Sequence, residues 1–310
     1  MPPEGLACLS KNELMSDDAI VRFVSIACRL GVTRIRLTGG EPLLRPGVVD
    51  LVARLAKVPG LSDLGMTTNG SRLLELALPL KKAGLHRLNI SLDSLEENQF
   101  KAITLSQMFP QVIAGIAAAA QLGFPIKINV VVLRSMNDDE ILDFVRLALR
   151  ENVAVRFIEF MPLCGTGWKP EMVYPLTEVK KLIRLHFNLT EEDRGDFVAQ
   201  SFTVSDGVRR ANLGFIATLS EPFCDTCSRI RLTADGKIRP CLFSREDFPV
   251  LPLLHSGATD DEIAALLRQA VFKKPRGSDY AEYWDRHKVV NLNAYQGREQ
   301  DTPTIRSIGG

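Results

Sequence analysis

The feature that most constrains the fold of this chain is an alternation of strand and helix patterns between about residue 17 and residue 188. The strand segments are short, β-branched, continuously apolar runs, which are typical of strands buried on both faces of a parallel sheet. We expect five parallel strands, at residues 33–38, 63–68, 87–92, 127–133 and 153–160. The pattern predicts an α/β fold made of repeated βα units.

Helix boundaries agree with this pattern. Ser16 precedes two acidic residues, which together are expected to cap a helix that Gly31 ends. Gly84 ends a second helix, and the acidic run after Asn137 opens a third that continues to about residue 151. Further helices are expected at about 177–186 and 260–269.

The N-terminal end departs from the repeat, because its first helix follows a loop, whereas every later helix follows a strand. We expect that one strand is missing and that the chain is truncated, since a parallel sheet without its opening strand has an unpaired edge. A complete domain that opens on a helix is the alternative. After residue 188 the pattern loosens into short strands, turns and a cysteine cluster, so we divide the chain into regions 1–188 and 189–310.

Charge and composition argue against several classes of partner. The formal net charge is +1, from 38 Lys and Arg against 37 Asp and Glu, so no basic surface for nucleic acid is expected. No signal segment opens the chain and no apolar run reaches membrane-spanning length, which favours a cytoplasmic protein without a membrane partner. In a reducing compartment, clustered thiols are more often metal ligands or catalytic groups than disulfides.

Three of the six cysteines form the strongest motif in the chain. Cys224 and Cys227 make a CxxC pair, and Cys241 follows on the same stretch of sequence. Three thiolates can hold a 4Fe-4S cluster with one open iron, or a zinc ion if a fourth ligand completes the tetrahedron. None of the four His residues has ligand spacing from the pair, which favours the cluster and leaves zinc open. Three unrelated buried thiols are the remaining interpretation.

Basic residues near these motifs predict an anionic ligand. Arg36, Lys127 and Arg156 each lie in an apolar strand segment, where an isolated cation is costly unless a negative group meets it. Arg229 and Arg231 follow the Cys pair and share one face of an extended segment, so their two guanidinium groups suit phosphate oxygens. The five cations together favour a phosphorylated ligand.

Carboxylates and turn motifs also stand near the predicted strands. Glu41, Asp93 and Glu159 provide an alternative, in which they neutralise the strand cations as structural ion pairs. The motifs TGGEP at 38–42, TTNG at 67–70 and SLDS at 91–94 each follow a strand. In parallel barrels the carboxyl ends of the strands build the active site, and paired glycines let a ligand approach the backbone. These motifs therefore point to one shared site.

Together these residues resemble the molybdenum cofactor biosynthesis protein A family of radical S-adenosylmethionine (SAM) enzymes, whose activity is that of a GTP 3',8-cyclase. The resemblance is carried by IRLTGGEPLLRP, RFIEFMP, CDTCSRIRLTADGKIRPCLF, the final Ile-Gly-Gly, and residues 1–5, which are similar to the segment after the family's CxxxCxxC motif. It implies an incomplete (βα)6 TIM-like radical SAM barrel, here without its first strand, and a C-terminal α+β region that binds an iron–sulfur cluster.

The resemblance also implies roles for individual residues. Gly40, Ser91 and Met161 match positions that bind SAM. Positions that bind GTP are matched by Arg36, Thr67, Lys127, Arg229 and Arg231, and Arg156 falls at a position that lines the site. Cys224, Cys227 and Cys241 match the ligands of a second 4Fe-4S cluster, whose free iron meets the guanine base in the family.

In the family, a first 4Fe-4S cluster cleaves SAM to a 5'-deoxyadenosyl radical, which abstracts the ribose 3' hydrogen of GTP and leads to 3',8-cyclo-7,8-dihydro-GTP. The cysteines for this first cluster would precede Met1, so we expect that the chain as given cannot generate the radical. Three functions stay open: the cyclase with an incomplete start, a non-catalytic remnant that binds GTP and an iron–sulfur cluster, and a zinc-stabilised scaffold protein. The resemblance identifies no catalytic side chain.

The partners that the resemblance implies are few. GTP is the small-molecule substrate and SAM the cosubstrate. The resemblance also allows a homodimer and a hand-over of the product to cyclic pyranopterin monophosphate synthase.

Overall fold

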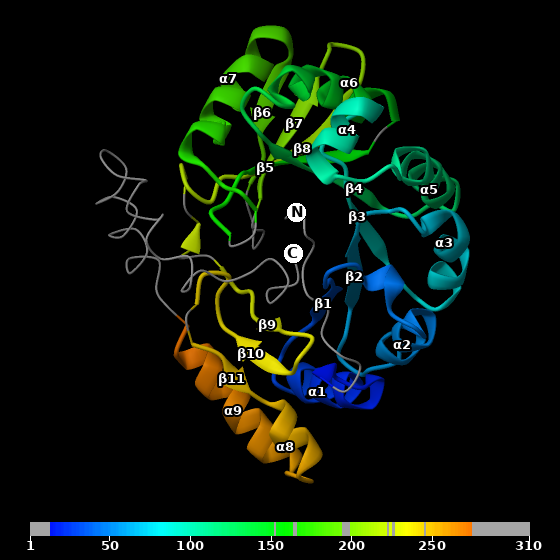
Figure 1. Cartoon of the computed structure of the whole chain (residues 1–310), viewed down its shortest axis with the longest axis vertical. Coiled ribbons are helices and arrows are strands. Elements are labelled where there is room, and N and C mark those ends of the chain that lie inside the picture. Colours follow the sequence, from blue (N-terminus) through cyan, green and yellow to red (C-terminus); the bar gives the residue numbers. More distant parts are fainter. Residues whose placement is uncertain are drawn as a thin grey trace.

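The computed structural model describes residues 13–151, 153–163, 166–193, 199–221, 223–224, 227–244 and 246–274. The expectations for residues 1–5 and for the final Ile-Gly-Gly, residues 308–310, lie outside these ranges. The described residues form one eight-stranded sheet and one three-stranded sheet, with helices packed against them (Figure 1).

The eight-stranded sheet is the main layer of the fold, in the strand order β1-β2-β3-β4-β5-β8-β7-β6. Strands β1 to β5 and β8 pair in parallel, and β7 and β6 extend the sheet antiparallel. The bounds are β1 (Arg34–Leu37), β2 (Asp63–Thr68), β3 (Arg87–Ser91), β4 (Ile126–Val132), β5 (Ala154–Glu159), β6 (Asn188–Glu191), β7 (Gln200–Ser205) and β8 (Arg210–Ile216). Figure 1 shows the sheet curving around a central region of the molecule.

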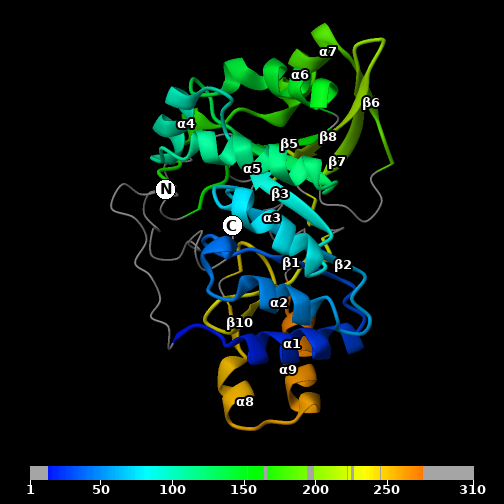
Figure 2. The ribbon, with the colours of Figure 1, turned by 90° about the vertical axis from the view of Figure 1, so that its right-hand side faces the viewer.

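Helices cover the outer side of this curved sheet, as Figures 1 and 2 show. Their bounds are α2 (Val48–Leu55), α3 (Leu73–Lys82), α4 (Glu97–Thr104), α5 (Phe109–Gln121), α6 (Ile141–Glu151) and α7 (Leu176–His186). Strand and helix side chains share one apolar core, in which the Phe157 ring meets Phe144 at 6.5 Å and Phe215 at 5.8 Å between ring centres. The helices therefore seal one side of the sheet and leave the other side for polar residues.

The C-terminal elements form a smaller unit beside α1 (Asp17–Arg29) (Figure 1). They are β9 (Arg231–Leu232), β10 (Lys237–Arg239), β11 (Phe248–Pro249), α8 (Leu251–His255) and α9 (Asp260–Phe272). Strand β10 pairs antiparallel with both β9 and β11. This small sheet carries the segment that follows the Cys pair.

Helix α9 is fixed to α1 by an apolar cluster and by ion pairs. Phe23 and Ile26 of α1 pack in the same cluster as Ile263 of α9. At the start of α9, Asp260 accepts hydrogen bonds from Arg22 and Arg29 at 2.9 and 2.7 Å. The N-terminal helix thus supports the C-terminal unit.

The five strands predicted from the sequence are confirmed, with each end within one residue of its predicted position. The first helix also begins as expected, because the Ser16 hydroxyl accepts a hydrogen bond from the Ala19 N–H at 3.2 Å. The acidic run after Asn137 first makes a short 3-10 turn, Asp138–Glu140, and α6 begins only at Ile141.

The main sheet continues past residue 188, where we expected a second region to begin. Strands β6, β7 and β8 all belong to it, and β8 pairs in parallel with β5. The short strands expected after residue 188 are thus partly an extension of the first region, and the boundary between 188 and 189 stays a prediction.

No single described helix has the length and apolar character to cross a bilayer. One bent pair, α4 with α5, meets the criteria of length and composition when its two helices are taken together.

The packing of α9 gives the first testable prediction. Ile263 is fully buried against α1, so Ile263→Ala should lower the free energy of unfolding by about 2–5 kcal/mol through lost burial and a residual cavity. Val271 lies on the same helix but is 52% exposed, so Val271→Ala should change the free energy of unfolding by less than about 0.5 kcal/mol. Chemical denaturation measures both; equal effects would contradict this packing.

Candidate functional site

Cationic side chains from three parallel strands gather on the inner side of the curved sheet. In β5 the residues Val155, Phe157 and Glu159 are buried, and Arg156 lies on the opposite side because side chains alternate along a strand. The same alternation places Arg36 of β1 and Lys127 of β4 on this inner side.

These cations lower one another's pKa. Burial, followed by the charge of Arg156, lowers the pKa of Arg36 to about 10. Burial and the charges of Arg156 and Arg87 lower the pKa of Lys127 to about 8. Solvent nevertheless reaches much of Arg36, so this side chain lines the inner face and is not part of the packed core. Such a crowd of like charges would be stabilised by a polyanion.

Glu159 does not neutralise Arg156, because the two side chains lie on opposite sides of β5. Its carboxylate accepts hydrogen bonds from the backbone N–H groups of Leu219 and Ser220, at 2.6 and 2.9 Å. Glu159 therefore anchors the segment that leads toward the Cys pair.

The carboxylates of Glu41 and Asp93 also accept hydrogen bonds from uncharged donors. Glu41 accepts from the Thr68 hydroxyl and the Asn69 N–H, at 2.6 and 2.7 Å. Asp93 accepts from the Val131 N–H at 2.8 Å, and burial raises its pKa to about 6. Within the described ranges, none of the ion pairs involves the three strand cations, so the structure does not support the ion-pair alternative.

Arg87 is a further cation of this group that no sequence motif singled out. Its guanidinium donates to both oxygens of Asp63, at 2.8 to 3.0 Å. The neighbouring strand makes room for it at Gly65, where an added Cβ would lie 2.8 Å from the guanidinium. Gly214 likewise leaves space for the Arg156 side chain, since a Cβ at Gly214 would lie 3.0 Å from the Arg156 Cγ. These glycines could have been recognised only with the strand register in hand.

The segment after the Cys pair brings two more cations toward the strands. Arg229 and Arg231 are both among the charges that lower the pKa of Arg36. Burial, followed by Arg229, lowers the pKa of Arg231 to about 10. The Arg229 guanidinium lies over the Phe223 ring at 5.4 Å, and its buried Nε has no hydrogen-bond partner among the described residues. The strand cations and the Cys segment therefore face one region.

The half-buried thiols of Cys224, Cys227 and Cys241 lie in this segment, and none is in a disulfide. Burial by itself would raise the pKa of Cys227, but the charge of Arg229 and its hydrogen bonds lower that pKa to about 7. The thiolate so favoured is the form that binds metals. In the part of the chain that the structure describes, no three Cys, His, Asp or Glu side chains are grouped as a metal site. The chemistry of three thiol donors in one segment fits an iron–sulfur cluster.

The remaining predicted positions lie at one edge of the sheet. Ser91 ends β3, while Gly40 and Met161 lie just beyond β1 and β5. Thr67 is the penultimate residue of β2, and its Oγ1 accepts a hydrogen bond from the Asn89 amide at 3.3 Å. Because the strands are parallel, all four positions share the carboxyl edge, where parallel sheets bind ligands.

Unsatisfied polar atoms mark the same inner face. The Asn89 and Asn129 Oδ1 atoms are buried without a hydrogen-bond partner among the described residues. Asn89 pairs in register with Lys127, and Asn129 with Arg156. Buried polar atoms ordinarily have partners, so these acceptors beside cations fit a ligand that carries both donors and negative charge.

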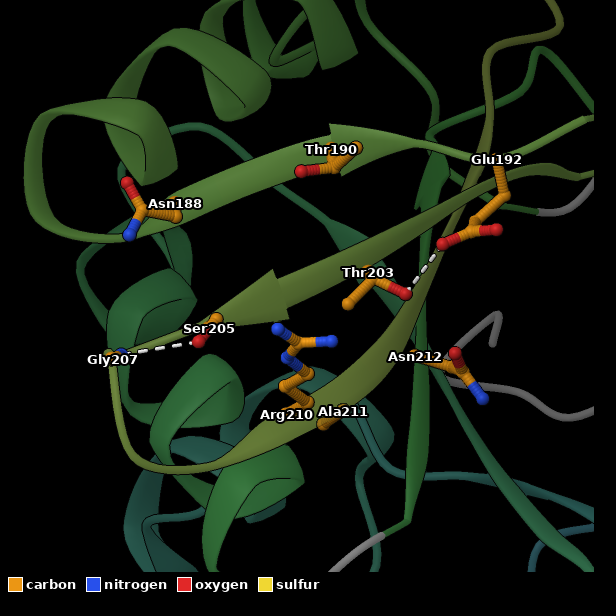
Figure 3. Close-up of a pocket in the computed structure, with 9 residues that line it drawn as sticks. All are labelled: Asn188, Thr190, Glu192, Thr203, Ser205, Gly207, Arg210, Ala211 and Asn212. Carbon is orange, nitrogen blue, oxygen red and sulfur yellow. Dashed lines mark hydrogen bonds between the residues drawn. The ribbon is translucent and has the colours of Figure 1, made fainter.

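A surface hollow of about 630 Å³ lies elsewhere, on the exposed side of β6, β7 and β8 (Figure 3). It is lined by Asn188, Thr190, Glu192, Thr203, Ser205, Gly207, Arg210, Ala211 and Asn212. Within it the Thr203 hydroxyl donates to Glu192 at 2.7 Å. None of the predicted site residues lines this hollow, so the candidate site is the inner face and not the hollow.

Comparison with known proteins finds relatives along most of the chain. Residues 9–148 match the model of the Radical SAM superfamily, and residues 153–280 match that of Molybdenum Cofactor Synthesis C. A GTP 3',8-cyclase of Thermodesulfovibrio yellowstonii is 41% identical over 89% of this chain and 87% of its own length. A GTP 3',8-cyclase of Streptomyces coelicolor is 42% identical over 90% of this chain and 83% of its own length. Molybdenum cofactor biosynthesis protein 1 of Drosophila melanogaster is 39% identical over 89% of this chain and 49% of its own length.

Among solved structures, the chain is similar to Streptococcus suis SuiB bound to S-adenosylmethionine, with a TM-score of 0.59. The match covers 81% of this chain and 60% of SuiB at 14% identity, which establishes a shared fold alone. The two family models and the 41–42% identity to the bacterial relatives establish the family as well as the fold. This chain belongs to the GTP 3',8-cyclase family of the radical SAM superfamily.

Proposed function

We propose that this chain acts as a GTP 3',8-cyclase, which converts GTP to 3',8-cyclo-7,8-dihydro-GTP with SAM-derived radical chemistry in molybdenum cofactor biosynthesis. The observation that carries the proposal is the group of strand cations facing Arg229 and Arg231, because it forms a site for a polyanion. Relatives named GTP 3',8-cyclase along nearly the whole chain support GTP as that polyanion.

Each part of the inner face has a proposed task. The triphosphate is bound by Arg36, Lys127, Arg156, Arg229 and Arg231, with Thr67 as a hydrogen-bonding neighbour. SAM is bound at the carboxyl edge by Gly40, Ser91 and Met161. The superfamily implies SAM and a 4Fe-4S cluster, which together supply hydrogen-atom abstraction when bound.

Cys224, Cys227 and Cys241 are proposed to hold a 4Fe-4S cluster with one iron open to the guanine base. Three thiols in one segment, the lowered pKa of Cys227 and the adjacent cations support this assignment. Glu159 and Lys180 hold the segment from outside: Glu159 accepts from two backbone N–H groups, and Lys180 pairs with Glu221 at 2.7 Å. These contacts fix the approach of the Cys segment to the sheet.

The finer architecture is also a proposal. The curved, largely parallel sheet supports an incomplete (βα)6 barrel, with a C-terminal α+β region that binds the iron–sulfur cluster. We keep the division into 1–188 and 189–310 as a proposal, although the family models meet between 148 and 153, just before β5. We also propose that the chain forms a homodimer and passes its product to cyclic pyranopterin monophosphate synthase.

The experiment that tests the function is metal analysis of the chain purified without oxygen, followed by GTP titration. The proposal predicts about four iron and four sulfide per chain at the three-Cys segment, with GTP bound in preference to ATP. Zinc in place of iron would favour the scaffold protein. No metal together with no GTP binding would overturn the proposal.

The cation group gives a prediction for Arg36. Arg36→Ala should weaken GTP binding by about 10- to 100-fold, because a hydrogen bond to a charged group contributes about 1.5–3 kcal/mol. Equilibrium dialysis with radiolabelled GTP measures the affinity. Arg54→Ala removes the same charge from an exposed outer position on α2 and should leave the affinity unchanged. Equal effects of the two variants would show that overall charge, and not the inner face, attracts GTP.

Lys127 gives a prediction for pH. Its pKa of about 8 means that the free protein loses this charge as the pH rises through 8, whereas bound triphosphate favours the protonated amine. GTP affinity should therefore be fully present below pH 8 and fall by up to about tenfold per pH unit above it. Lys127→Arg stays charged and should flatten the profile between pH 7 and 9. The assignment fails if the two profiles coincide.

A further inference from the structure

We propose that Lys274 is a positioning residue for the cluster proposed at the Cys segment, and that its ammonium donates to the Cys227 sulfur and raises the reduction potential of that cluster. The inference rests on the proposed cluster ligands. Lys274 lies just after α9, 47 residues beyond Cys227, so no sequence spacing connects the two.

The contacts of Lys274 use the full donor capacity of an ammonium group. Nζ donates to the Cys227 carbonyl at 2.5 Å, to the Arg229 carbonyl at 2.7 Å and to the Cys227 Sγ at 3.5 Å. An ammonium has three N–H donors, and here each has an acceptor. Two of the acceptors are the carbonyls of Cys227 and Arg229, so the same group holds this segment of backbone and reaches the sulfur.

The position of Lys274 is determined by a helix that is fixed elsewhere. Its own N–H donates to the Val271 carbonyl at the end of α9. At the other end, Asp260 is held by Arg22 and Arg29, and Ile263 is buried against α1. Helix α9, anchored on α1, thus places one ammonium at the Cys segment.

The positive charge of Lys274 indicates an electrostatic role for its contact with the Cys227 sulfur. Lys274 and Arg229 both act as positive charges on the Cys227 thiol, so placing the two together is unfavourable unless an anion compensates them. Among its three acceptors, two backbone carbonyls and one sulfur, only the Cys227 sulfur can carry a full negative charge, as a thiolate. Hydrogen bonds and positive charge at a ligand sulfur stabilise the reduced state of an iron–sulfur cluster.

The test compares Lys274→Met and Lys274→Arg with Lys273→Met, which removes the adjacent charge from an exposed side chain. Each chain is purified without oxygen, its iron and sulfide are measured, and the cluster potential is determined by redox titration monitored by electron paramagnetic resonance. Lys274→Met should shift the midpoint to a more negative value, or lose iron that Lys274→Arg retains. Lys273→Met should match the wild-type chain in both readouts.

The outcomes separate this inference from the proposed function. A wild-type chain without iron overturns the cluster and the role of Lys274 together. A wild-type chain with its cluster, and Lys274→Met with the same iron content and the same midpoint, overturns only the role of Lys274. Iron loss that extends equally to Lys274→Arg overturns the part played by the charge.

Discussion

The arrangement of the site depends on the mutual repulsion of cations on the inner side of the curved sheet. Arg36, Lys127 and Arg156 are crowded together, and burial combined with neighbouring charge lowers the pKa of each. The carboxylates considered for neutralisation from the sequence, such as Glu159, instead accept hydrogen bonds from uncharged donors. Among the described residues, none of these three cations forms an ion pair, and such a group favours binding of an anion.

The backbone accommodates these cations through alternation and through small neighbours. Side chains alternate across each strand, so apolar residues face the helices while Arg156 faces inward. Gly65 and Gly214 leave space for Arg87 and Arg156 on the adjacent strands. Packing on one side of the sheet and charge on the other are thus two consequences of a single strand pattern.

Much of this could be predicted from local sequence. Strand positions, the cap at Ser16 and the presence of Arg36 and Lys127 in apolar strands follow from short-range patterns, and the structure confirms them. Contacts that depend on register or on distant segments could not be predicted. Arg87 with Asp63, and Lys274 with Cys227, join residues whose separation carries no periodic signal. The continuation of the sheet through β8 was missed because its pairing with β5 is equally non-local.

The central claim is that the strand cations and the Cys segment bind one ligand between them. The most direct test is the electron paramagnetic resonance spectrum of the reduced chain, recorded with and without saturating GTP. The account predicts that GTP changes the cluster spectrum and that ATP at the same concentration does not. GTP that binds tightly while leaving the spectrum unchanged would place the triphosphate and the cluster in separate sites and contradict the account.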